Sequence, residues 1–213
     1  MEADRIQLKP FLIACAGVFI LEGVGNPLMR AGWRYPVAVL GLLRIAEIWV
    51  VIGIFGRWGR GLKDLGLARD QNSAGIRQGV IWSAGFGMLV LIGFGLLVLM
   101  GQNPLQLLRM RLPVDPIDRF WYILVGILVA PIGEELFFRG VLYGYFRRWG
   151  VFPALAASSL LFVSAHSSAG IPVTQMAGGV LFAVAYEIEG RLMTPITIHA
   201  LGNLALFSLS FFN

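Results

Sequence analysis

Long hydrophobic segments follow one another through almost the whole of this 213-residue chain. A transmembrane helix needs about 20 predominantly apolar residues, and seven segments come near that length. They are residues 10–28, 36–56, 78–101, 120–146, 151–166, 171–189 and 193–212. The fifth segment is short, so six or eight crossings fit the pattern as well. The segments predict an all-α fold, a polytopic transmembrane helix bundle of about seven spans.

The composition agrees with a membrane protein. Hydrophobic residues make up 57% of the chain and charged residues 14%, whereas a soluble domain carries about 25% charged residues. The loops are too short to hold a separate soluble domain, so we expect residues 1–213 to form a single membrane-embedded domain. The compact loops favour a multi-pass protein of a prokaryotic inner membrane.

The net charge of +5 is better explained by topology than by a charged partner. A nucleic-acid-binding protein needs a solvated basic face, but these basic residues are spread over short loops, so no nucleic acid partner is expected. Their densest cluster, within residues 57–77, follows the second segment. The positive-inside rule places this loop and the N-terminus in the cytoplasm. The expected partners are the lipid bilayer and a membrane-associated substrate.

Three charged residues, Glu134, Glu135 and Arg139, lie inside the hydrophobic segment 120–146. Each such charge at mid-membrane costs roughly 2.5–3.5 kcal/mol, so the group needs a compensating interaction. Glu135 and Arg139 have i,i+4 spacing and can pair on one helix face. Glu134 lies about 100° away around the helix, which leaves one carboxylate without a local partner. A second pair, Arg44 and Glu47, has i,i+3 spacing in an earlier segment and should neutralise itself.

His166 is the first candidate partner for Glu134. Glu134 lies 16 residues before Gly150, and His166 lies 16 residues after it. If the two segments form a helical hairpin with equal rise on both arms, the two side chains reach the same depth. Phe162 precedes His166 by four residues, which places an aromatic ring one turn from the imidazole. The spacing therefore predicts a contact between Glu134 and His166.

His199 and Asn203 form another polar pair with i,i+4 spacing, in the last segment. Both side chains can donate hydrogen bonds to an oxyanion, although a polar clamp between helices would use the same residues. His199 lies only nine residues past the expected turn at Gly190, which places it nearer the inner surface than Glu134. A kink at Pro195, or a tilted or re-entrant sixth segment, would remove this difference in depth.

The ordered motifs resemble the CPBP family of intramembrane glutamic endopeptidases, also called the CAAX protease or Abi family. The resemblance is carried by Glu134-Glu135-x-x-x-Arg139, Phe162-x-x-x-His166 and His199-x-x-x-Asn203. It covers roughly residues 120–210, which would form the catalytic core. The first 119 residues contribute membrane spans only.

The resemblance implies a function and a role for each motif residue. Glu134 and His166 would activate a water molecule for attack on a peptide bond, and His199 and Asn203 would form the oxyanion hole. Three further residues would support the site: Glu135, Arg139 and Phe162. No cofactor or metal is implied. The expected substrate is a membrane protein, a lipidated protein or a peptide precursor, cut near its C-terminus.

Two other classes of protein fit the same residues. A zinc-dependent membrane metalloprotease could use Glu134, His166 and His199 as ligands, because two histidines and one carboxylate suffice for a catalytic zinc site. Sensitivity to a chelator would identify it. A non-enzymatic scaffold, immunity protein or small transporter would use the polar residues for binding only. Such a protein would keep its biological effect in a Glu134→Ala variant.

Overall fold

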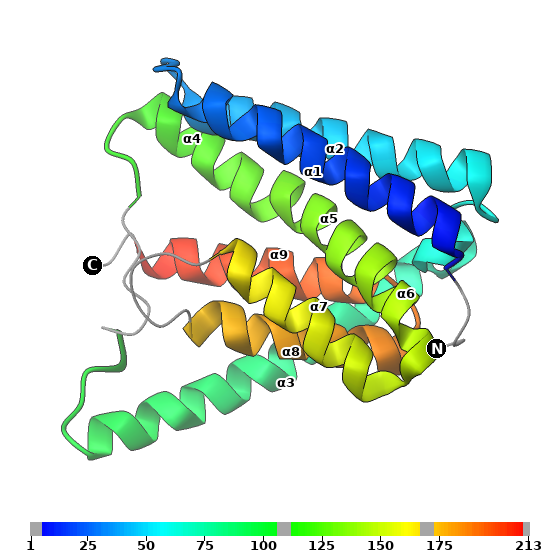
Figure 1. The fold of residues 1–213 in the computed structure, drawn as a ribbon. Coiled ribbons are helices and arrows are strands. Elements are labelled where there is room, and N and C mark those ends of the chain that lie inside the picture. The colour runs from blue at the N-terminus through cyan, green and yellow to red at the C-terminus, as the bar shows by residue number, and fades with distance from the viewer. Residues whose placement is uncertain (1–5, 106–111, 167–172, 211–213) are drawn as a thin grey trace.

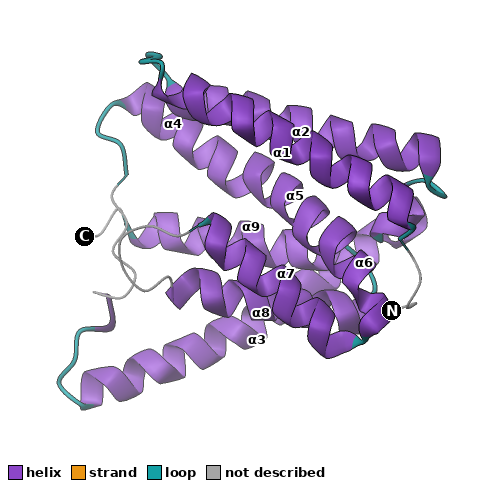
Figure 2. Ribbon diagram, viewed as in Figure 1, coloured by secondary structure: helices purple, strands orange, loops and turns teal. Residues whose placement is uncertain are grey.

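The computed structural model describes residues 6–105, 112–166 and 173–210. Helices joined by loops and turns make up this part of the chain, and no strand occurs in it (Figure 2). Seven helical rods lie at the positions of the seven hydrophobic segments (Figure 1). The prediction of an all-α membrane helix bundle is therefore confirmed.

Six of the rods are single helices. They are α1 (Leu8–Arg30), α2 (Pro36–Trp58), α3 (Asn72–Leu99), α7 (Val151–Ala165), α8 (Val173–Glu189) and α9 (Met193–Leu209). The remaining rod, residues 116–149, is continuous but changes its winding. It consists of α4 (Pro116–Leu124), the π-helix η4 (Val125–Val129), α5 (Ala130–Glu135), the π-helix η5 (Leu136–Tyr143), α6 (Gly144–Phe146) and the 3-10 turn η6 (Arg147–Trp149). Two short 3-10 turns lie between α2 and α3, namely η1 (Leu62–Leu65) and η2 (Arg69–Gln71).

Four helical stretches of the described chain are long and apolar enough to cross a membrane. They are Leu8–Met29, Pro36–Trp58, Leu62–Leu99 and Pro116–Trp149. The helices α7, α8 and α9 have 15, 17 and 17 residues, fewer than the roughly 20 that a full crossing needs. Length and composition thus support four of the seven expected crossings directly.

The rods form two layers with α3 beside them (Figure 1). One layer holds α1, α2 and the rod 116–149, and the other holds α7, α8 and α9. Glycines allow the backbones to approach closely, as is common between membrane helices. A Cβ atom on Gly41 of α2 would lie 2.7 Å from Val125 of η4, and one on Gly79 of α3 would lie 2.4 Å from Thr197 of α9. The three charged residues near the middle of the rod 116–149, Glu134, Glu135 and Arg139, contact residues of the second layer.

The rod 116–149 begins with a capped turn and carries its carboxylates between two π-helices. Asp115 accepts hydrogen bonds from the backbone N–H groups of Ile117 and Asp118, and Pro116 occupies the first turn. The short helix α5, which contains Glu134 and Glu135, lies between η4 and η5. π-Helical turns are rare and are frequent at functional sites, because the extra residue in the turn re-aims the side chains that follow.

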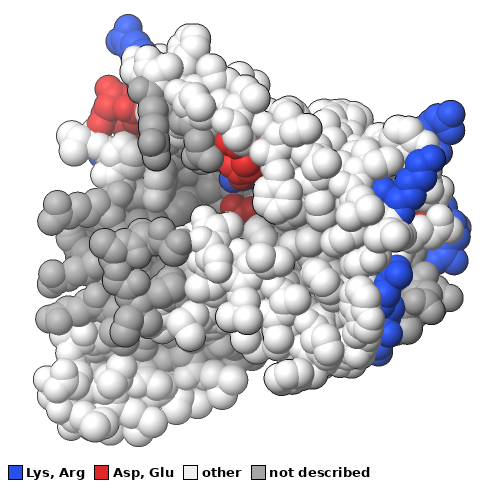
Figure 3. Space-filling view, viewed as in Figure 1, with Lys and Arg blue, Asp and Glu red and all other residues white. Residues whose placement is uncertain are grey.

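One end of the face shown in Figure 3 is basic. Lys and Arg side chains gather at the end where the N-terminus and α6 lie (Figure 3). There the rod is fastened to α8, because Tyr143 donates a hydrogen bond of 2.9 Å to Glu187 and Arg147 forms an ion pair of 2.9 Å with the same carboxylate. This distribution agrees with the expected cytoplasmic position of the basic loops.

Candidate active site

The two adjacent glutamates of α5 have different surroundings. Glu135 is 0% exposed, and its side chain points into the packed interior. Glu134 has a side chain that is 12% exposed and faces both histidines. Consecutive residues of a helix point about 100° apart, so one short helix supplies a fully buried carboxylate and an accessible one.

Arg139 is the partner of Glu135, as its spacing predicts. Its Nη1 atom donates to Oε1 of Glu135 at 2.9 Å, and neither side chain is exposed. Its Nη2 atom donates to the carbonyl oxygen of Gly179 in α8 at 3.1 Å. The guanidinium carbon also lies 4.5 Å from the ring centroid of Phe162 and 5.1 Å from that of Phe182. Arg139 therefore joins α5, α7 and α8 behind the two histidines.

His166 follows the last residue of α7, and a backbone hydrogen bond determines which of its ring nitrogens carries a proton. Its Nδ1 atom lies 2.8 Å from the carbonyl oxygen of Phe162. A carbonyl oxygen only accepts hydrogen bonds, so Nδ1 must carry a proton and Nε2 is left to face the site. This Nε2 atom lies 3.4 Å from Oε2 of Glu134. The contact predicted from the hairpin spacing is confirmed.

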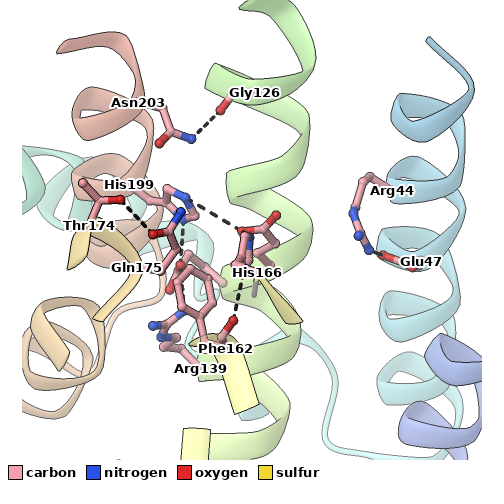
Figure 4. A network of polar contacts seen from close by, with 12 residues as sticks. Arg44, Glu47, Gly126, Arg139, Phe162, His166, Thr174, Gln175, His199 and Asn203 are labelled. Carbon is pink, nitrogen blue, oxygen red and sulfur yellow. Dashed lines mark hydrogen bonds and ion pairs between the residues drawn. The ribbon is translucent and has the colours of Figure 1, made fainter. Parts of the chain in front are cut away.

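His199 approaches Glu134 from the other side. Its Nδ1 atom lies 2.8 Å from Oε1 of Glu135, and its Nε2 atom lies 3.8 Å from Oε2 of Glu134 (Figure 4). The ring of Phe182 stacks on the imidazole, with centroids 4.7 Å apart and planes 21° apart. Phe162 contacts both imidazoles, with centroids 4.5 Å from His166 and 5.9 Å from His199. The two Nε2 atoms thus face one carboxylate oxygen.

The expected difference in depth between His199 and Glu134 is absent, because Nε2 of His199 lies 3.8 Å from Oε2 of Glu134. Helix α9 runs without a break from Met193 to Leu209, and Pro195 lies in its first turn, where proline is tolerated. The kink proposed at Pro195 is therefore not the cause. The rod 116–149 is wound as a π-helix in η5 and as a 3-10 turn in η6 between Glu135 and Gly150, so counting residues at α-helical rise does not give the depth of Glu134.

Asn203 lies one turn beyond His199 on α9 and has a partner of its own. Its Nδ2 atom donates a hydrogen bond of 2.7 Å to the carbonyl oxygen of Gly126 in η4 (Figure 4). An amide nitrogen carries two N–H groups, so this bond leaves one donor and fixes the orientation of the amide. The structure brings Glu134, His166 and His199 together, and Asn203 borders this cluster without a hydrogen bond to it.

A second polar cluster lies on α1 and α2, to one side of the histidines. Arg44 pairs with Glu47, as predicted, and also with Glu22 at 2.6 Å. The Arg44 side chain packs near Gly133, where a Cβ atom would lie 3.7 Å from Arg44 Cδ. Figure 4 shows Arg44 and Glu47 on the side of α2 that faces the rod 116–149. The cluster therefore flanks Glu134 without an ion pair to it.

Two contacts of the site were not identified from the sequence. Glu135 holds His199 as well as Arg139, and Phe182 stacks on the imidazole of His199. Spacing within one helix predicts neither contact, because the partners lie on different helices. In the first contact, 64 residues separate Glu135 from His199. Among the described residues, no group of three or more His, Cys, Asp or Glu side chains is arranged as a metal site.

The fold and the site define a class of protein. A helix bundle with long apolar helices encloses a carboxylate that faces two imidazoles, together with a buried carboxylate–guanidinium pair. This is the arrangement expected for a membrane-embedded enzyme that handles protons and water.

Comparison with known proteins gives a family match over part of the chain. Residues 116–205 match the family described as type II CAAX prenyl endopeptidase Rce1-like. This match confirms the resemblance carried by the motifs. The chain is also similar to an Escherichia coli protein named "Uncharacterized 24.3 kDa protein", with 29% identity over 154 residues, 68% of each chain. No solved structure shows a significant match.

Proposed function

We propose that this protein is an intramembrane endopeptidase that hydrolyses a peptide bond near the C-terminus of a membrane-associated substrate. The observation that carries the proposal is the position of one Glu134 oxygen, 3.4 Å from Nε2 of His166 and 3.8 Å from Nε2 of His199. At these separations, the carboxylate and the two ring nitrogens surround the same small space. The match of residues 116–205 to a protease family supports peptide hydrolysis as the reaction.

In the proposed reaction, Glu134 acts as the general base toward a water molecule held between it and His166. The carboxylate takes a proton from the water while the water oxygen bonds to the carbon of the scissile peptide. The electron pair of the C=O bond moves to its oxygen and forms an oxyanion. When the C–N bond breaks, the leaving amine takes the proton from Glu134. The hydrogen bond from His166 to Phe162 keeps the Nε2 atom of His166 directed at this water.

His199 and Asn203 stabilise the oxyanion in this scheme. The Nδ1 atom of His199 lies 2.8 Å from the Glu135 oxygen that also accepts from Arg139. In the proposed scheme the imidazole carries a proton on each ring nitrogen at the time of reaction, and it donates Nδ1–H to Glu135 and Nε2–H to the oxyanion. Asn203 contributes the amide N–H that its bond to Gly126 leaves available. Glu135 and Arg139 serve as positioning residues in this account.

The substrate class follows from the family and from the surroundings of the site. Relatives described as CAAX prenyl endopeptidases make a farnesylated CAAX peptide the first substrate to test. A peptide precursor or a tail of another membrane protein would meet the same chemical groups. We infer that the protein acts in a prokaryotic inner membrane, without a cofactor.

Comparative mass spectrometry of membrane peptides tests this function. Cells that make the wild type should release C-terminal fragments that are absent from cells making Glu134→Gln, a variant of nearly the same shape that cannot take up the proton. Glu189→Gln is the matched control, because Glu189 is a partly buried glutamate paired with Arg191 and bonded to Trp82, away from the histidines. Identical peptide patterns for all three proteins would contradict the proposed activity and favour a binding role.

A further inference from the structure

One ridge of α8 leads from the stacked imidazole toward the outer part of the site. Gln175, Gly178 and Phe182 are spaced by three and four residues, so they lie along one face of the helix. The ring of Phe182 stacks on His199. A Cβ atom on Gly178 would have three ring atoms of Phe182 as its nearest neighbours, at 3.1 to 3.8 Å. The ring of Phe182 therefore covers Gly178, and Gln175 is the next side chain along this face beyond the Phe182–His199 stack.

The amide of Gln175 is oriented by its neighbour. Thr174 Oγ1 donates a hydrogen bond of 2.8 Å to Oε1 of Gln175. This bond occupies the acceptor end of the amide and leaves both N–H groups of Nε2 at the other end. The Nε2 atom has no hydrogen-bond partner among the described residues. Figure 4 shows the Gln175 side chain directed from α8 toward the part of the site that contains His199 and Asn203.

Gln175 lies farther along the helix axis than the groups that react. Gln175 lies seven residues, about 10 Å of helix, from Phe182 in the direction of the α8 N-terminus. Asn203 lies one turn from His199 in the direction of the α9 C-terminus. The two helices are antiparallel neighbours (Figure 1), so Gln175 and Asn203 are displaced from the Phe182–His199 stack toward the same end of the molecule.

We propose that Gln175 binds the substrate backbone, donating a hydrogen bond from its amide to a peptide carbonyl oxygen a few residues from the scissile bond. This inference rests on the proposed peptidase function and adds a substrate contact to it. A backbone carbonyl is an acceptor that must find a donor when it leaves water. The donor lies beyond His199, so its bond is the same in the bound substrate and in the transition state. Such a contact changes KM rather than kcat.

Binding is measured on full-length protein that carries Glu134→Gln, so that the peptide is not consumed. The probe is a fluorescein-labelled, farnesylated CAAX peptide, and the readout is fluorescence anisotropy in detergent micelles. Adding Gln175→Leu, which keeps the length of the side chain and removes both donors, should weaken binding about 3- to 10-fold, as the loss of one hydrogen bond predicts. Gln78→Leu is the matched control, because Gln78 is a half-buried glutamine of α3, and it should leave the Kd unchanged.

The outcomes separate this inference from the function on which it rests. Binding to Glu134→Gln that is unaffected by Gln175→Leu would overturn the role of Gln175 and leave the peptidase function standing. Peptide that binds but is not cut by the wild type would contradict the peptidase function. The anisotropy would still measure the contribution of Gln175 to peptide binding. Peptide that binds to neither protein would overturn both the CAAX substrate and the subsite.

A kinetic comparison completes the test. With Glu134 intact, Gln175→Leu should raise KM for the same peptide by the factor seen in binding and leave kcat within about 2-fold, as expected for uniform binding. Thr174→Val, which removes the hydroxyl that orients the amide, should raise KM by a smaller factor. A loss of kcat of roughly 100-fold with unchanged KM would place Gln175 in the oxyanion hole and refute the proposed role.

Discussion

The Glu135→Gln substitution keeps the size of a buried side chain and removes its charge. Glu135 and Arg139 are both 0% exposed. A single oxygen, Oε1, lies 2.9 Å from Arg139 Nη1 and 2.8 Å from His199 Nδ1. Without the negative charge, the guanidinium keeps only uncharged partners there, namely the amide oxygen of the new side chain, the carbonyl oxygen of Gly179 and the faces of three aromatic rings. A positive charge would then be buried without a counter-charge.

Removing one partner of a buried ion pair costs about 3–5 kcal/mol in the free energy of unfolding. We expect a loss of that size for Glu135→Gln, measured by denaturant titration in mixed micelles with the fluorescence of the six tryptophans. The double variant Glu135→Gln, Arg139→Gln should recover part of the loss, because neither charge is then left unpaired.

Glu187→Gln is the control for Glu135→Gln. Glu187 pairs with Arg147, but their side chains are 17% and 18% exposed. Water screens such a pair, so its loss should cost less than about 1 kcal/mol beyond the hydrogen bond from Tyr143. An equal loss of unfolding free energy in Glu135→Gln and Glu187→Gln would refute the reasoning about the buried pair.

Three further substitutions test other parts of the account. Asn203→Ala should lower kcat by roughly 100- to 1000-fold if Asn203 stabilises the oxyanion. If Asn203 only clamps helices, the substitution should cost about 0.6 kcal/mol of stability and leave turnover unchanged. Turnover per folded molecule distinguishes the two roles. Phe182→Leu removes the ring stacked on His199, and thermal unfolding should report a loss of at least about 0.5–1.5 kcal/mol. Gly79→Ala places a methyl group 2.4 Å from the Cβ atom of Thr197, and should destabilise the α3–α9 contact by about 1–3 kcal/mol in the same measurement.

The local features of this protein could be predicted from its sequence. The seven helices follow the hydrophobic segments, and the pairing of Glu135 with Arg139 follows from their i,i+4 spacing. The contact between Glu134 and His166 follows from equal distances to the turn at Gly150. Each of these depends on helix geometry within one segment or across one short turn.

The remaining contacts depend on how distant helices are rotated and shifted against one another. The hydrogen bond between His199 and Glu135 joins residues 64 positions apart, and the bond from Asn203 to Gly126 joins residues 77 positions apart. Helical periodicity states which face a residue occupies but not which helix lies opposite it. The depth of His199 was misjudged because residue counts along one helix do not state how α9 is shifted against the rod 116–149, and the hydrophobic pattern gives no sign of the π-helix η5.

Turnover per folded molecule of the wild type and Glu134→Gln, after exhaustive treatment with a metal chelator, tests the central claim most directly. The assay follows cleavage of the farnesylated CAAX peptide in micelles and counts folded protein by its unfolding amplitude. Our account predicts full wild-type activity after chelation, and no detectable cleavage by a Glu134→Gln protein that unfolds like the wild type. Loss of wild-type activity on chelation would instead support the zinc alternative, and cleavage by Glu134→Gln at the wild-type rate would contradict Glu134 as the base.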